Sequence, residues 1–311
     1  MQTGRRTMPE TCRTGTIWWK TLIVVAIGLT LSCRPPASRL IEKADFKAIV
    51  LSDTHISSDT TKTRRLLRLV QKINAGKFPG VELVFVTGDV VSSVFGKYTH
   101  ENPDTSDNRL RRAVSVLRRL RIPFYLAMGN HDHKIGNFRD SDAPWPQEEI
   151  GAMWELWRQQ TGFAPYYSVK HRGWKFIVLN SMGGRHLNRH FDDTQMDWLG
   201  RELEENGPVA LLFHHPIKTD HFRFWCKFKD LGSPQKDRRF YRLLRRYQAK
   251  IKGVFVGHGH LFVHDVLFGR IPVFETDSFG EGSDESFYIV SFNAQKQTLR
   301  VIKANETVNV N

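Results

Sequence analysis

The sequence contains few cysteines and no uncharged apolar run long enough to span a membrane. Its 311 residues include only three cysteines, at positions 12, 33 and 226. The uncharged apolar stretch near the amino terminus covers only residues 21–32, whereas a spanning helix needs roughly 20 apolar residues. The sequence also has no internal repeat and no low-complexity segment. The chain is long enough to bury a sizeable core, as one large domain or two small ones.

The apolar stretch at 21–32 has the length of a signal-peptide core, which is roughly 7–15 residues. Basic residues precede it, and Pro35 and Pro36 follow it. The end of the stretch, Leu-Thr-Leu-Ser before Cys33, resembles a bacterial lipoprotein signal, in which the cysteine is lipidated. We therefore expect residues 1–32 to be a cleaved signal peptide and Cys33 to carry acyl chains that anchor the protein to a membrane. A retained single-span anchor is the alternative.

This interpretation predicts an exported, membrane-anchored lipoprotein, either periplasmic or on the cell surface. Residues 33–45 would form a linker, residues 46–305 a folded domain, and residues 306–311 a tail. With Cys33 lipidated, Cys226 is the only other cysteine of the mature chain. No intrachain disulfide is then expected, so stability must come from a packed core.

Over the chain as a whole, basic residues outnumber acidic residues. The sequence has 46 Lys and Arg residues against 32 Asp and Glu residues, which gives a formal net charge of +14. The first 32 residues hold four basic groups and one acidic group, so the remainder still carries +11. Such an excess favours phosphorylated substrates, nucleic acid or an acidic membrane surface. A solvated basic surface without a specific partner is equally consistent with the composition.

Short apolar runs alternate with amphipathic helical patterns in the first half of the chain. Runs at 46–51, 82–87 and 122–128 predict strands, and 62–74 and 109–120 predict the helices between them. This order indicates a parallel sheet, in which ligands collect beyond the carboxyl ends of the strands. Further helices are expected at 147–160, 192–205 and 238–248, and further strands at 166–170, 175–179, 209–213, 253–256, 261–268, 271–274, 286–292 and 298–302.

Metal-binding residue types follow five of these strands directly. They are Asp53, His55, Asp89, Asn130, His214, His258 and His260. Imidazole and carboxylate together suit Mn, Fe, Zn or Ni better than Ca or Mg. Seven ligands are too many for one ion in an open catalytic site, but they suit two ions that share a carboxylate and lie roughly 3.5–4 Å apart.

The order and spacing of these residues resemble the calcineurin-like metallophosphoesterases. That superfamily carries the motifs DxH, GD, GNH(D/E), HxP and GHxH, and the resemblance covers about Lys47 to Val301. The sequence is most similar to bacterial class III cyclic-nucleotide phosphodiesterases, which share DxH and GNHD. The resemblance implies an α/β fold, a four-layer α/β/β/α sandwich of two mixed sheets flanked by helices.

The resemblance also implies a role for each motif residue. Asp53, His55 and His260 would hold one metal ion, and Asn130, His214 and His258 the other, with Asp89 bridging both. His131 would contact the scissile phosphate and protonate the leaving oxygen. Mn or Fe would be the metal, with Zn as an alternative.

The expected function is hydrolysis of a nucleotide-type phosphodiester by hydroxide activated at the two metals. A phosphomonoesterase or a nuclease with the same metal site is the first alternative, although nucleic acid is not favoured as a partner. A non-catalytic cell-surface binding module is the alternative of another class. The sequence does not indicate an oligomeric state.

One feature departs from the phosphoprotein phosphatases of this superfamily. They carry an Asp shortly after the GD motif that partners the catalytic histidine, whereas Val90, Val91, Ser92 and Ser93 follow Asp89 here. The residue that orients His131 therefore cannot be identified from the sequence. Asp132 is expected to hydrogen-bond the local turn.

Several aromatic and histidine residues lie outside the motifs. The insert at 218–237 could form a lid over the site or a local hydrophobic patch. The candidates for contacting substrate are Arg223 and Trp225 in this insert, and His215 beside the expected ligand His214. Core positions are expected for Trp154, Trp157 and Trp198. Most of the remaining histidines are expected at the surface, namely His133, His171, His186, His190, His221 and His264.

Overall fold

The computed structural model describes residues 45–99, 101–136, 144–221 and 231–309. These residues belong to one compact unit that runs from Lys43 to Asn311. The predicted signal peptide, Cys33, Arg223 and Trp225 lie outside the described residues. Within the described part of the chain, none of the helices is long and apolar enough to cross a membrane.

The described strands form two mixed sheets. The first has the order β11-β10-β1-β2-β3, and the second has the order β4-β5-β6-β7-β9-β8. The first sheet consists of β1 (Phe46–Leu51), β2 (Val81–Val86), β3 (Phe124–Leu126), β10 (Tyr288–Asn293) and β11 (Thr298–Lys303). The second consists of β4 (Tyr167–His171), β5 (Trp174–Val178), β6 (Val209–Leu212), β7 (Ile251–Val256), β8 (Val263–Leu267) and β9 (Ile271–Glu275).

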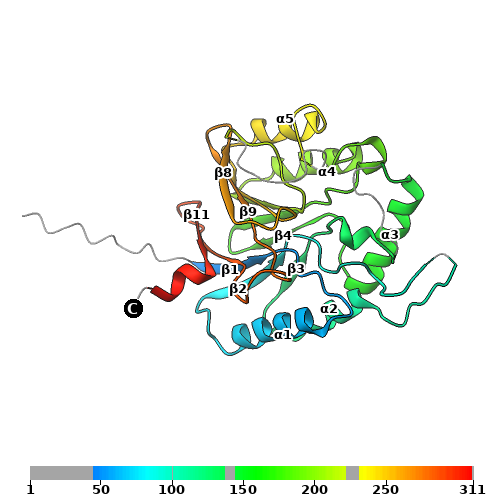
Figure 1. Cartoon of the computed structure of the whole chain (residues 1–311). Coiled ribbons are helices and arrows are strands. Elements are labelled where there is room, and N and C mark those ends of the chain that lie inside the picture. Colours follow the sequence, from blue (N-terminus) through cyan, green and yellow to red (C-terminus); the bar gives the residue numbers. More distant parts are fainter. Residues whose placement is uncertain (1–44, 100, 137–143, 222–230, 310–311) are drawn as a thin grey trace, which may run out of the picture. The chain divides into compact units, whose positions relative to one another are not determined.

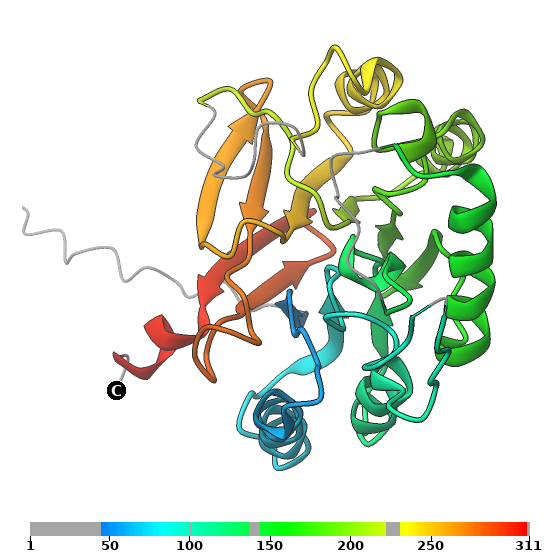
Figure 2. The same cartoon turned by 45° about the vertical axis from the view of Figure 1, so that its right-hand side comes forward.

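Helices cover the outer face of each sheet. They are α1 (Thr60–Asn74), α2 (Arg109–Leu117), α3 (Gln147–Thr161), α4 (Asp193–Glu204) and α5 (Arg238–Arg246), with short 3-10 turns η1 (His131–His133), η2 (Arg185–Leu187) and η3 (Ala304–Asn309). Figure 1 shows α1 and α2 on one side of the sheets and α4 and α5 on the other. Figure 2 shows the same layers with α3 standing beside the sheets. The predicted four-layer α/β/β/α sandwich is confirmed.

The alternating direction of side chains along each strand explains how the sheets pack against each other and against the helices. On β1, Ala48 and Val50 belong to the core between the two sheets, whereas Ile49 and Leu51 pack towards α1 and α2. Successive strand residues point to opposite faces, so a strand buried on both sides needs apolar residues at every position. The second sheet repeats the pattern, with Leu211 on the side of α4 and α5.

The carboxyl ends of the parallel strands meet at one edge. Leu51 at the end of β1 pairs with Val86 of β2, and Val86 pairs with Leu126 of β3. In the second sheet, Leu212 of β6 pairs with Phe255 of β7. The loops that follow these five strands therefore leave both sheets on the same side.

Three expectations need correction in detail. The strand predicted at 122–128 is shorter and spans Phe124–Leu126. Trp157 is fully buried, but Trp154 and Trp198 only pack against the edges of the core. His133 and His190 were expected at the surface but are buried, because each imidazole has a specific acceptor: the carbonyl oxygen of Gly129 for His133 and the carboxylate of Asp237 for His190.

Candidate metal centre

All seven predicted metal ligands come together at the carboxyl ends of the strands. Three overlapping groups have ligand atoms within 4.8 Å of one another. They are Asp53 with His55 and His260, Asp89 with His214 and His258, and His55 with Asp89 and His131. The residues arrive from five separate loops, so their convergence is a consequence of the parallel strand order rather than of any local sequence.

The first group lies after β1 and β7. His260 Nε2 is 3.3 Å from His55 Nε2 and 3.3 Å from Asp53 Oδ1. His55 Nε2 is also 3.6 Å from Asp53 Oδ1 and 3.8 Å from Asp89 Oδ2. Asp53 Oδ1 is buried and makes no hydrogen bond of good geometry with the described residues. An orphaned carboxylate oxygen that faces two imidazoles is the environment expected at a cation site.

The second group lies after β2, β3, β6 and β7. Asn130 Oδ1 is 3.1 Å from both His214 Nε2 and His258 Nδ1, and these two nitrogens are 3.3 Å apart. His214 Nε2 is 3.3 Å from Asp89 Oδ2, the same oxygen that faces His55. His214 Nδ1 donates to the carbonyl oxygen of Thr87, which leaves Nε2 to face the group. Asp89 is thus the carboxylate within reach of both groups.

Five of the seven candidate ligands adopt left-handed backbone conformations. The φ angles are 53° at Asp53, 44° at His55, 49° at Asp89, 76° at His258 and 56° at His260. Non-glycine residues rarely adopt this region and are held there only when the surrounding structure fixes them. Such strain concentrates at functional sites, and here it coincides with the convergent side chains.

Two glycines allow the ligand loops to approach one another. A Cβ atom on Gly129 would overlap the backbone nitrogen and Oδ1 of Asp89. A Cβ atom on Gly88, whose φ is +102°, would lie 2.5 Å from His214 Nδ1. The glycines of the GD and GNH motifs are therefore explained by close packing beneath the candidate metal ligands.

The electrostatics of the cluster favour bound cations. Burial raises the pKa of Asp53, but the neighbouring His260 and the charge on His214 outweigh it and lower the value to about 2. Burial likewise raises the pKa of Asp89, and the charges of His214 and His131 reverse this and hold it well below its usual range. Two buried carboxylates therefore stay ionised side by side because positive charge on the neighbouring imidazoles stabilises them, and bound cations could supply that charge instead. The donor set, its geometry and its charge all fit two metal ions.

His131 stands beside the cluster in an arrangement that the sequence did not reveal. Its Nδ1 donates to the carbonyl oxygen of Ser92 at 2.8 Å, and its backbone N–H donates to Asp89 Oδ1 at 2.8 Å. The Nζ atom of Lys134 lies 3.2 Å from His131 Nε2, and Lys134 is only 5% exposed. A backbone carbonyl thus stands in the place of the missing acidic partner. Because any residue supplies a carbonyl, no sequence signal could have identified it.

Asp132 ties two ligand loops together, as the sequence predicted for a turn residue. Its carboxylate accepts hydrogen bonds from the backbone N–H groups of Val90, Val91 and Gly129 at 3.3, 3.1 and 2.8 Å. Burial and the charge of Asp89 raise the pKa of Asp132 to about 7. The residue fixes the loop after β2 against the loop after β3, and no ligand group includes it among the described residues.

The segment at 276–287 supports the loop after β1 and was not singled out from the sequence. Backbone hydrogen bonds run from Phe279 N to the Ser52 oxygen and from Gly280 N to the Asp53 oxygen. Glu281 Oε2 lies 3.2 Å from His260 Nδ1, so this carboxylate orients the ring whose Nε2 faces Asp53. Only the tertiary structure connects these distant segments.

His215 packs against the candidate ligands His214 and His258 and is not exposed to solvent. It is fully buried, and its ring centroid is 5.0 Å from that of His214 and 4.8 Å from that of His258. Its Nδ1 lies 2.7 Å from Ser181 Oγ. Burial lowers the pKa of His215 well below its usual range, so its ring is neutral. Of the three predicted substrate contacts, Arg223 and Trp225 lie outside the described residues.

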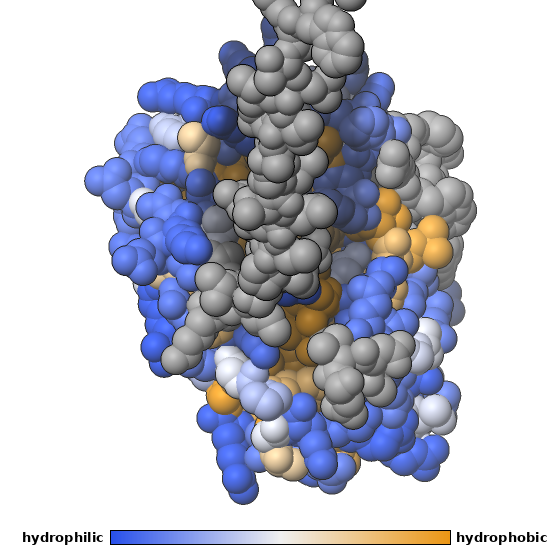
Figure 3. Space-filling model, turned by 90° about the vertical axis from the view of Figure 1, so that its left-hand side faces the viewer, coloured by the Kyte–Doolittle hydropathy of each residue, from blue (hydrophilic) through white to orange (hydrophobic). Residues whose placement is uncertain are grey.

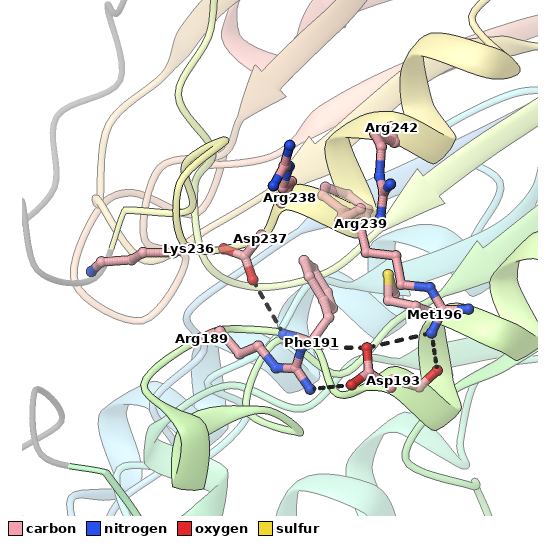
Figure 4. Close-up of a pocket in the computed structure, with 10 residues that line it drawn as sticks. Arg189, Phe191, Asp193, Met196, Lys236, Asp237, Arg238, Arg239 and Arg242 are labelled. Carbon is pink, nitrogen blue, oxygen red and sulfur yellow. Dashed lines mark hydrogen bonds and ion pairs between the residues drawn. The ribbon is translucent and has the colours of Figure 1, made fainter.

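A surface pocket of about 220 Å³ lies between α4 and α5 and is separate from the candidate ligands (Figure 4). Asp193 bridges Arg189 and Arg239 at its edge. Asp237 lines the pocket and accepts from His190 Nδ1 at 2.9 Å, and the His190 ring lies 5.1 Å from that of His215. None of the pocket's lining residues is a candidate metal ligand.

Comparison with known proteins agrees with this geometry. A family model described as calcineurin-like phosphoesterase matches residues 46–262, which is more than half of the chain. A Psychrobacter protein named "probable cyclic nucleotide phosphodiesterase" is 26% identical over 182 residues, covering 58% of this chain and 46% of its own length. The glycerophosphodiester phosphodiesterase GpdQ of Enterobacter lignolyticus is 25% identical over 230 residues, covering 68% of this chain and 69% of its own.

A further curated relative matches part of the chain, and a solved structure shows the same fold. A sphingomyelin phosphodiesterase of Caenorhabditis elegans is 21% identical over 211 residues, covering 59% of this chain and 32% of its own length. The chain therefore spans about half or less of the Psychrobacter and Caenorhabditis relatives. The crystal structure of a dimetal phosphatase from Danio rerio superimposes with a TM-score of 0.56 at 13% identity, covering 80% of this chain and 93% of that one.

Proposed function

The chain belongs to the calcineurin-like phosphoesterase family, and we propose that it hydrolyses phosphodiesters of the nucleotide type. The observation that carries this proposal is the pair of ligand groups on either side of Asp89, with His131 beside them. The relatives named for cyclic nucleotides, glycerophosphodiesters and sphingomyelin all carry the name phosphodiesterase, which supports a diester over a monoester.

We assign each ligand group to one metal ion. Asp53, His55 and His260 would hold the first ion, Asn130, His214 and His258 would hold the second, and Asp89 would contact both. Bound divalent ions would neutralise phosphate oxygens and lower the pKa of a bound water from 15.7 to about 7. Mixed imidazole, amide and carboxylate donors suit Mn or Fe, with Zn as an alternative.

His131 is assigned to the leaving oxygen of the substrate. Because Nδ1 donates to the Ser92 carbonyl, the Nε2 atom is the one available to a substrate or to Lys134. A proton on Nε2 can pass to the departing oxygen, and the Lys134 ammonium beside Nε2 can replace it. The Lys134 side chain also places positive charge beside the position of the phosphoryl group.

A substrate panel tests the proposal. The chain would be reconstituted with Mn²⁺ and assayed on bis(p-nitrophenyl) phosphate, p-nitrophenyl phosphate, a cyclic nucleotide and single-stranded DNA. We expect faster hydrolysis of the diester and the cyclic nucleotide than of the monoester. Preference for the monoester or for DNA would instead establish a phosphomonoesterase or a nuclease. Hydrolysis of none of them would leave the non-catalytic binding module as the better interpretation.

We also propose that the protein is exported and anchored through lipidated Cys33. Support comes from the apolar stretch at 21–32 and the Leu-Thr-Leu-Ser-Cys sequence that ends it. Mass spectrometry of the mature amino terminus would be expected to show a diacylated or triacylated Cys33. An unmodified Cys33, or a retained segment before it, would overturn this assignment.

A further inference from the structure

One side of the domain carries positive charge that lies far from the candidate metal ligands. The strand-start face is the surface where the parallel strands β1, β2, β7 and β9 begin. All seven ligands follow the carboxyl ends of strands. Because parallel strands begin at one edge of a sheet and end at the other, the strand-start face is opposite the metal centre.

The helices α1 and α2 contribute the first part of this charge. Neither helix contains an acidic residue. Their carboxyl ends are joined by Asn74, which donates to the carbonyl oxygen of Arg119 at 2.8 Å and accepts from the N–H of Arg121 at 2.9 Å. Around this junction four cationic side chains are exposed and have no ion pair with any carboxylate that the structure describes: Lys77, Arg118, Arg119 and Arg121.

A pocket of about 500 Å³ contributes the second part, at the beginning of β7 and β9. Lys252 and Arg270 line it together with apolar Ile251, Pro272 and Leu299, and no carboxylate belongs to its lining. Figure 3 views the side of the domain that lies to the left in Figure 1, where hydrophilic side chains cover most of the visible surface around an apolar strip. Cationic groups beside apolar ones match the chemistry of a phospholipid surface.

The position of the amino-terminal sequence favours a lipid surface over nucleic acid. The domain begins with β1 at Phe46, on this same face, and 13 residues separate it from the end of the apolar stretch at 21–32. A chain of that length reaches at most about 45 Å, so a membrane anchor would hold this face near the bilayer. A nucleic acid bound here would lie at the wrong edge of the sheets for cleavage at the metals.

We propose that the strand-start face docks on an anionic lipid surface and turns the metal centre away from it. The inference rests on the proposed membrane anchoring and is independent of the substrate. Basic side chains at a negatively charged leaflet attract it within about a Debye length, so docking is expected to weaken with salt. The chemistry required of the partner is negative headgroup charge.

A vesicle-binding experiment tests the inference without the anchor. The protein would begin at residue 33 and carry Cys33→Ser, since the compact unit from Lys43 onward contains all described core clusters. Co-sedimentation would be measured with phosphatidylcholine vesicles that contain or lack phosphatidylglycerol. The test variant combines Lys77→Glu, Arg118→Glu, Arg119→Glu and Arg121→Glu. We expect it to lose at least about tenfold in affinity for anionic vesicles.

A matched control variant distinguishes an effect of this face from an effect of the total charge. Combining Arg64→Glu, Lys97→Glu, Arg111→Glu and Arg238→Glu changes one Lys and three Arg, all exposed and near the other ends of the helices. The control should bind anionic vesicles nearly as well as the starting protein. Equal losses in both variants, or no binding by the starting protein, would overturn the inference. Binding of single-stranded DNA would be measured on the same proteins. If the test variant loses DNA binding but keeps vesicle binding, the face is a nucleic-acid surface and the inference is overturned.

Folding and activity provide two further readouts. Both variants should keep the circular dichroism, and the test variant should keep the hydrolysis of a soluble nitrophenyl diester, because its four positions lie on the strand-start face, opposite the metal centre. If the test variant is unfolded, the same four positions changed to Gln offer a milder charge removal that should give a smaller loss of vesicle binding. Normal vesicle docking with no hydrolysis would contradict the proposed function and leave this inference standing.

Discussion

The Nδ1 atom of His131 lies 2.8 Å from the carbonyl oxygen of Ser92. A carbonyl oxygen only accepts hydrogen bonds, so Nδ1 carries a proton, and Nε2 lies 3.2 Å from the Nζ atom of Lys134. The orientation of the proposed general acid therefore depends on the main chain of the loop after β2, and the Ser92 side chain is not needed for it.

Substituting His131 should cost much of the activity, whereas substituting Ser92 should cost little. We expect His131→Ala to lower kcat by about 10²–10⁴-fold on diesters with poor leaving groups, which is the usual contribution of a general acid. The loss should be much smaller for nitrophenyl esters, whose leaving group needs no proton. Ser92→Ala should stay within a few-fold of the unsubstituted enzyme. A large loss in Ser92→Ala with normal metal content would contradict the role of the carbonyl.

Substituting Lys134 tests the surroundings of His131 in a second way. Its Nζ is 3.2 Å from His131 Nε2, and a hydrogen bond from a charged donor contributes about 1.5–3 kcal/mol. We expect Lys134→Met to lower kcat/KM at least about tenfold, because 1.36 kcal/mol corresponds to one factor of ten. Lys134→Arg should keep more of the activity since it preserves the charge. Unchanged kinetics in Lys134→Met, with both metals bound, would exclude a role in turnover.

A glycine substitution tests the packing beneath the ligands. A Cβ on Gly129 would overlap Asp89, so we expect Gly129→Ala to displace this carboxylate and reduce metal content at both proposed sites. Gly151→Ala on α3 is the matched control, because nothing lies within 4 Å of its added Cβ and alanine favours helices. Metal analysis after gel filtration should show a deficit in the first variant alone. Equal metal content in the two would contradict the account of this loop.

The buried pair of Asp237 and His190 should make stability depend on pH. Burial raises the pKa of Asp237, but the charge of His190 and hydrogen bonds from His190 and Phe191 lower it below its ordinary value of 3.8. A carboxyl group whose pKa is lowered by folding stabilises the native state above its unfolded pKa, and this stabilisation is lost as pH falls through the folded pKa.

Asp237→Asn should therefore cost about 1–3 kcal/mol in the free energy of unfolding near neutral pH, as expected when a buried hydrogen-bonded group loses its partner. The difference from the unsubstituted protein should shrink below about pH 4. Urea unfolding at a series of pH values measures both. A difference that stays constant across this range would show that Asp237 does not act through its charge.

The ligand positions could be predicted from the sequence because each follows an apolar strand directly. Asp53, Asp89 and His214 stand at the carboxyl ends of parallel strands, and the topology alone brings such ends together. The order of the motifs then indicated the family and, through it, the four-layer sandwich.

What could not be predicted depends on partners that are remote in sequence or belong to the backbone. The carbonyl oxygen of Ser92 has no residue signature, and the contact of Glu281 with His260 arises only when the segment at 276–287 folds over β1. The burial of His190 could not be predicted, because its acceptor, Asp237, is 47 positions away in the sequence. The spacing of apolar residues indicates which face of a helix or strand is buried. It does not indicate which buried polar groups will find hydrogen-bond partners there.

In the proposed mechanism, two metal ions act together on a phosphodiester. Titration of metal-free protein with Mn²⁺, following hydrolysis of bis(p-nitrophenyl) phosphate, tests this most directly. We expect activity to rise until two equivalents per chain are bound and then to level off, with Asp89→Ala remaining inactive because its carboxylate faces both groups. Full activity at one equivalent, or no hydrolysis with two ions bound, would contradict the account.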